Sequence, residues 1–107
     1  MSSRIVTDPF YVDEKRTVPF DFAAQVGAGE TISSATAVSS VYSGTDSTPD
    51  IVNGAASVSG TVVSVTLGGG AFKGTVGVIY QLLVEATKST GEIIDMSTYI
   101  AFVPALP

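Results

Sequence analysis

The stretch 76–87, with the sequence Val-Gly-Val-Ile-Tyr-Gln-Leu-Leu-Val-Glu-Ala-Thr, decides the fold class of this chain. Every second side chain from Val78 to Ala86 is apolar or aromatic, whereas the alternate face mixes Ile79 and Leu83 with polar residues. A period of two residues is typical of a β-strand with one buried face. We therefore expect a strand here, with Tyr80 in the core and its hydroxyl group bonded to the backbone at a corner of the fold.

The rest of the chain alternates short apolar runs with turns rich in Gly, Ser, Thr, Asp and Pro. Further strands are expected at 16–22, 31–42, 51–52, 56–58, 61–67 and 93–103. Pro19 places the first of them at a sheet edge, because proline cannot donate a ladder hydrogen bond. Asn53-Gly54 predicts a two-residue turn. About six to eight short strands at this spacing indicate an all-β sandwich.

The run 31–42 is less regular than 76–87. Its alternate residues are expected to share one face: Ile32, Ser34, Thr36, Val38, Ser40 and Tyr42. The middle of the run is small and polar, so the pattern leaves its register, or a bulge, open.

Composition excludes several classes of function. The 107 residues suit one domain, and the chain contains no Cys, His or Trp. Thiol nucleophiles, histidine bases and the usual zinc ligands are therefore missing together. A net charge of −5 argues against nucleic-acid binding, and no apolar run is long enough for a membrane span. We expect no enzyme, no cofactor, no metal, no nucleic-acid partner and no membrane partner.

Two motifs that could carry chemistry are better explained as loops. The glycine-rich segment 68–74 lacks the Ser or Thr that follows the lysine of a phosphate-binding loop, because Gly74 follows Lys73. The acids Asp46 and Asp50 lie in a Ser/Thr-rich loop without a third carboxylate close in sequence, which is too few for calcium. We assign no catalytic, cofactor-binding or metal-binding residue.

Residues 1–15 differ from the rest and are interpreted as an N-terminal arm on a domain that spans 16–107. Phe10, Tyr11 and Val12 either cap the domain's own core or bind a partner, and both readings stay open. The arm is expected to be ordered only against a neighbouring chain, and its removal should leave the domain folded. The candidate partner-binding residues are Ile5, Phe10, Tyr11, Val12 and Phe72.

Two groups of residues carry a resemblance to short virion proteins of tailed bacteriophages. The first is Phe20-Asp21-Phe22 followed by Gly-Glu-Thr-Ile-Ser-Ser-Ala at 29–35. The second is Val-Thr-Leu-Gly-Gly-Gly at 65–70, then Gly-Thr-Val at 74–76, Tyr80, and Thr-Lys-Ser-Thr-Gly at 87–91. These stretches are similar to the opening strand, the glycine-rich loop, the long penultimate strand and the final hairpin of fibre–tail adaptor or head–tail proteins.

The resemblance implies an immunoglobulin-like β-sandwich that works as a non-enzymatic structural component of the virion. It would join neighbouring virion proteins, such as portal, adaptor, tail or fibre subunits, and form a homo-oligomer or symmetric ring. The alternatives are a capsid decoration (cement) protein or, from a different class, a carbohydrate-binding sandwich module.

Overall fold

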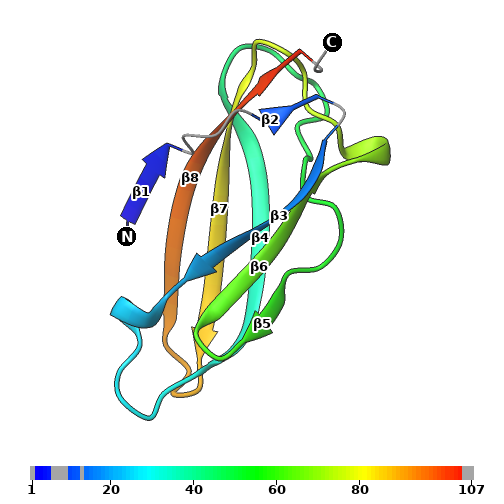
Figure 1. Cartoon of the computed structure of the whole chain (residues 1–107). Helices are drawn as coiled ribbons and strands as arrows, with labels where there is room; N and C mark the ends of the chain where they lie inside the picture. The colour runs from blue at the N-terminus through cyan, green and yellow to red at the C-terminus, as the bar shows by residue number, and fades with distance from the viewer. Residues whose placement is uncertain (1, 6–9, 13, 105–107) are drawn as a thin grey trace.

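The computed structural model describes residues 2–5, 10–12 and 14–104, which form two packed β-sheets (Figure 1). The five-stranded sheet has the order β1 (Ser2–Ile5), β8 (Ile93–Val103), β7 (Ile79–Lys88), β4 (Ile32–Ser43), and β2 (Phe10–Tyr11) also pairs with β8. The three-stranded sheet has the order β3 (Lys15–Asp21), β6 (Val62–Gly68), β5 (Ser57–Ser59). This architecture confirms the all-β sandwich. The strand order is compatible with an immunoglobulin-like arrangement, which stays a prediction.

Two short 3₁₀ turns, η1 (Ala23–Gln25) and η2 (Gly70–Phe72), complete the regular structure of the described residues. Over those same residues, no helix has the length and apolar character needed to cross a bilayer.

The inner face of β7 confirms the expected strand and its phase. Tyr80, Leu82, Val84 and Ala86 are all buried, and so is Val78 directly before the strand. They pack with residues of the facing sheet and of the loops around it, which include Phe20, Phe22, Ile51, Val63, Val65 and Leu67. Apolar burial on both inner faces therefore holds the two sheets together.

β3 confirms the expected edge strand. Among the strands that the structure describes, it pairs only with β6, in the antiparallel sense, and Pro19 lies opposite Ser64 in this ladder. The missing N–H of proline is tolerated because the outer side of an edge strand needs no ladder bond.

The structure corrects the expected phase of β4 at its start. A register shift between Ile32 and Ser34 turns Ile32 into the core, while Ser34, Thr36, Val38, Ser40 and Tyr42 share the outer face. A β-bulge adds one residue to a strand and so exchanges the faces on its two sides. A second shift lies between Val41 and Ser43, which leaves 34–41 in unbroken register with β7.

The expected turn at Asn53-Gly54 is wrong. Val52 bridges to Leu67, and β5 farther along pairs with the same strand β6 in the same antiparallel sense. The chain therefore continues along β6 and does not reverse. The expected strand at 51–52 is only this isolated bridge. The Asn53 N–H donates to the Thr66 carbonyl (2.8 Å), and the Asn53 side-chain amide donates to the Gly68 carbonyl (2.8 Å).

Candidate protein-binding surface

Phe10, one of the candidate partner-binding residues, belongs to the core of its own chain. Its side chain is 1% exposed, and its ring lies 4.8 Å from the Phe102 ring and under the Arg16 guanidinium at 4.9 Å. Gly68, with φ +79°, makes this packing possible, since a Cβ there would meet the Glu14 carbonyl and the Phe10 ring. In this conformation Phe10 offers almost no surface to a partner.

The backbone around Phe10 is also paired within the chain. Phe10 and Tyr11 run parallel to Phe102 and Val103 of β8, and the Val12 N–H donates to the Val103 carbonyl (3.0 Å). Order in this part of the N-terminal segment therefore does not require a neighbouring chain, in contrast to the expectation. The boundary between an arm and a domain at residue 15 stays a prediction.

The other candidates fall into two places. Tyr11, Val12 and Phe72 are half-buried, and β2 and η2 lie at the same end of the sandwich (Figure 1). Ile5 pairs by backbone register with Tyr99 in the middle of β8, and its side chain lies outside the described residues. The structure thus separates Ile5 from the other candidates.

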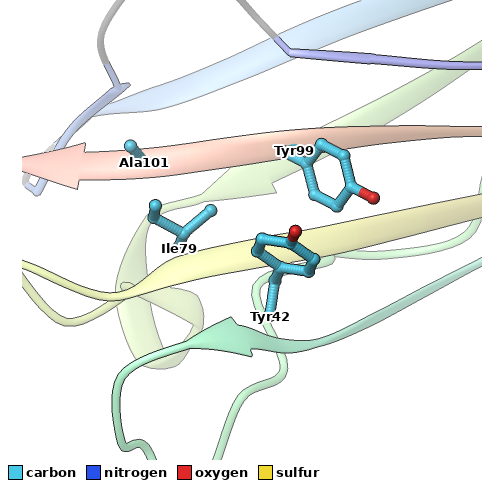
Figure 2. Close-up of a pocket in the computed structure, with 4 residues that line it drawn as sticks. All are labelled: Tyr42, Ile79, Tyr99 and Ala101. Carbon is cyan, nitrogen blue, oxygen red and sulfur yellow. The ribbon is translucent and has the colours of Figure 1, made fainter.

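A different apolar surface lies on the outer face of the five-stranded sheet. Tyr42 of β4, Ile79 of β7, and Tyr99 and Ala101 of β8 line a shallow hollow of about 130 Å³, called here the tyrosine hollow (Figure 2). The two tyrosine rings are 4.4 Å apart and tilted by 47°. Tyr42 is 60% exposed.

The apolar character of this face extends beyond the hollow along β4 and β7. Val38 is 63% exposed and lies opposite the half-buried Leu83. The polar pair Ser40 and Gln81 lies between this pair and the hollow. Single exposed apolar residues are ordinary, whereas the four grouped residues of the hollow mark a candidate protein-binding site. The alternation in 76–87 already placed Ile79 and Leu83 outside the core. That signal could have found the surface, but the meeting of Tyr42 with Tyr99 could not be read from it.

Asp46 and Tyr80 form a hydrogen-bonded corner that fastens the loop after β4 to the start of β7. The Tyr80 hydroxyl donates to Asp46 Oδ2 (2.5 Å) and accepts from the Thr75 N–H (2.7 Å). This confirms a core tyrosine with a backbone partner. Burial, and then the Asp46 hydrogen bond, raise the pKa of Tyr80, while the Tyr80 hydrogen bond lowers the pKa of Asp46.

These two shifts bear on what the corner can do chemically. Both act to keep the ordinary protonation states, a neutral tyrosine and an ionised aspartate, so neither group is prepared to exchange a proton near neutral pH. The described residues contain no group of three or more His, Cys, Asp or Glu that could hold a metal ion. The corner is therefore best explained as a structural link.

A second cluster of charge lies at the opposite end of β7, where Lys88 is buried. Its Nζ contacts Glu92 Oε1 at 2.8 Å and Glu30 Oε1 at 3.1 Å. The Glu92 hydrogen bond, then the Glu30 hydrogen bond, raise the pKa of Lys88. This cluster ties the loop before β4 to the β7–β8 turn.

Comparison with known families identifies the class of protein to which this sandwich belongs. Residues 11–101 match the family model described as podophage GP4 fiber-tail adaptor protein gp77. The match covers most of the chain, so the chain belongs to this family. It is a phage fibre–tail adaptor structural protein and a component of the virion. No curated protein matches the sequence.

Proposed function

We propose that this adaptor acts without catalysis, by holding a tail protein and a fibre protein on two neighbouring surfaces of one rigid sandwich. The observation that carries the proposal is the family match over residues 11–101. The protonation states of the Asp46–Tyr80 corner agree with it, because they leave neither of these two groups ready for acid–base work. The capsid-decoration and carbohydrate-binding alternatives gain no support from this family.

The tyrosine hollow is the first contact surface of the proposal. Protein interfaces are enriched in aromatic residues and depleted of charge at their centres, and tyrosine is among the residues that dominate binding energy. The four residues that line the hollow are uncharged, and two of them are tyrosines. A protruding apolar side chain of the fibre protein would fill it.

A joining protein needs a second surface that does not overlap the first. Tyr11, Val12 and Phe72 are half-buried, and none of them lines the hollow. Tyr11 pairs with Val103, two residues beyond Ala101 of the hollow, so this second surface borders the first at the same end of the five-stranded sheet. We propose this second surface as the contact with the tail protein. The net charge of −5 supports partners that are proteins rather than nucleic acid, and we likewise propose that no membrane takes part.

The proposal is tested with phage particles that carry Tyr99→Ser, with Ile93→Ser as the matched control. Both residues lie on β8, but Ile93 lies outside the hollow and is 67% exposed. The fibre protein per particle, measured by mass spectrometry, should fall by at least about tenfold for Tyr99→Ser and stay unchanged for the control.

Two results would contradict different parts of the proposal. Normal fibre content in Tyr99→Ser particles would remove the hollow as the fibre contact. Normal fibre content in particles that lack the protein altogether would remove its role in fibre attachment.

A further inference from the structure

β4 is the edge strand at one end of the five-stranded sheet, and the described residues leave its outer edge unpaired. β4 pairs with β7 on one side only (Figure 1). Within the described ranges, the one backbone hydrogen bond that β4 makes outside its ladder with β7 joins the Ile32 N–H to the Gly60 carbonyl of the turn after β5 (3.3 Å). The loop after β4 is tied to the Ser39 hydroxyl, through the Pro49 carbonyl and the Ile51 N–H, and leaves the β4 backbone untouched.

β4 also lacks the devices that normally protect such an edge. Natural edge strands are kept from pairing by prolines, by charged side chains or by shortness. β3 carries Pro19 together with Lys15, Arg16 and Asp21, and β5 has only three residues. β4 has twelve residues, Ile-Ser-Ser-Ala-Thr-Ala-Val-Ser-Ser-Val-Tyr-Ser, without a charge, a proline or a glycine. Its two bulges lie near its ends and leave 34–41 regular.

The same strand carries apolar side chains that lack cover. Two of the four large hydrophobic residues that are exposed in the described chain, Val38 and Tyr42, lie on β4. A strand added at the edge would place its side chains about 4.5–5.5 Å from those of β4. One added strand would therefore satisfy the open peptide groups and cover Val38 at the same time.

We propose that the occupant of this edge is a second copy of the chain, paired antiparallel through β4. A two-fold axis perpendicular to the sheet makes the contact isologous and keeps both outer faces on the same side. With Val38 opposite Val38 of the other copy, Ala35 lies opposite Val41, Thr36 opposite Ser40, and Ala37 opposite Ser39. This register pairs the longest unbroken stretch of β4 with itself.

Charge permits this self-pairing although each copy carries −5. β4 contributes no charge, the exposed Asp50 of the loop tied to Ser39 accepts from the Val52 N–H, and the nearest acid on the outer face, Glu85, lies one strand inward opposite Thr36. Two such residues in the dimer are separated by at least three strand spacings, or about 14 Å, which exceeds the screening length in physiological salt. Pairing of two copies through β4 is separate from the binding of a tail protein or a fibre protein.

A continuous sheet formed in this way would present two tyrosine hollows on one face. A bivalent adaptor holds a repeated partner more tightly than a single copy does, since the second contact forms within the complex. The pairing therefore has a use in a symmetric virion.

The test uses the purified 107-residue chain, which contains no native cysteine. Val38→Cys places two thiols on the two-fold axis, where opposite Cα atoms are about 4.5–5.5 Å apart and suit a disulfide. Under mild oxidation, Val38→Cys should form disulfide dimers at least about tenfold faster than the control Ile93→Cys, which is equally exposed but on another strand. Equal rates would overturn the proposal.

The register has its own test. Thr36→Cys and Ser40→Cys should cross-link readily when mixed and poorly when each is alone, because Thr36 faces Ser40 of the other copy. Equal cross-linking of each variant alone would overturn this register.

A measurement without cysteine completes the design. By sedimentation equilibrium the native chain should be dimeric, and Val38→Lys, which sets two like charges opposite each other, should raise the dissociation constant at least about tenfold. Ile93→Lys should not change it. A native chain that stays monomeric would overturn the proposal, whereas fibre attachment in particles reports separately on the adaptor function.

Discussion

Both faces of β7 carry large apolar residues, but these residues meet different surroundings. On the inner face, Leu82 and Val84 are wholly buried under the second sheet. On the outer face, Ile79 and Leu83 are half-buried beside the exposed Tyr42 and Val38. Apolar residues on the inner face stabilise the fold, and those on the outer face remain available to other molecules. The difference lies in what covers each face, because burial and not composition yields hydrophobic stabilisation.

The largest contrast is expected from one charge placed on either face of β7. Val84→Asp puts an unpaired carboxylate into the core and should abolish folding, with a loss of more than about 3 kcal/mol. Leu83→Asp, its neighbour on the outer face, should lose about 1 kcal/mol. Circular dichroism and urea titration measure both. A folded Val84→Asp variant would show that the inner and outer faces have been exchanged.

The next contrast tests whether the N-terminal segment contributes to the hydrophobic core. Phe10→Ala removes a buried ring from between Phe102 and Arg16 and should lower the free energy of unfolding by about 3–5 kcal/mol. Tyr11→Ala, at a half-buried neighbour, should lose about 1 kcal/mol. Deletion of residues 1–15 should destabilise the domain at least as much as Phe10→Ala does. Equal urea midpoints for both point variants would restore the picture of an arm that contributes nothing to the fold.

A pair of tyrosines offers a smaller contrast between the faces. Tyr80→Phe leaves the Thr75 N–H and Asp46 without their partner and should lower the free energy of unfolding by about 1–3 kcal/mol. Tyr42→Phe, on the outer face, should change it by less than about 0.5 kcal/mol. Thermal denaturation followed by circular dichroism resolves the two. A Tyr80→Phe variant with native stability would mean that the corner contributes nothing.

The smallest effect concerns Lys88, an inner-face position filled by a charge where β7 reaches the end of the core. The Gly27 N–H, then Lys88, lower the folded-state pKa of Glu30 below its ordinary value of 4.5. The stabilisation by ionised Glu30 is therefore complete above that value and is lost as the pH falls through the lowered pKa.

Glu30→Gln isolates this effect. Between about pH 6 and about pH 3, the urea midpoint of the native chain should fall further than that of Glu30→Gln, because the variant has no proton to bind at this position. The remaining acid dependence of the variant reports Asp46 and Glu14, whose pKa values are also lowered. Identical acid profiles would show that Glu30 contributes no pH-dependent stability.

Much of the fold could be predicted because it depends on local geometry. Alternation along 76–87 identified β7 and its buried face, and Pro19 identified an edge strand, since both follow from how one strand presents its side chains and amides. The phase of Ile32 and the course of the chain at Asn53 could not be predicted. A bulge and a continued ladder depend on the partner strand, which the local pattern does not contain.

The candidate surface, too, could be predicted only where it depends on local pattern. The outward position of Ile79 could be predicted from the alternation of β7, but the burial of Phe10 against Phe102 could not. The sequence could not decide whether Phe10 caps the domain's own core or binds a partner. An apolar residue beside a charged cluster can pack equally well in either place.

By itself, the amino-acid sequence determined an all-β sandwich with a polar, lightly charged surface and no histidine or cysteine chemistry, because these properties belong to residues one at a time or to neighbours along a strand. Only the tertiary structure decided that Phe10 is part of the core, that Tyr42 contacts Tyr99, and that β4 is an edge strand of its sheet. These are relations between segments far apart in the chain. They are set by which strands pair and which face each bulge turns inward.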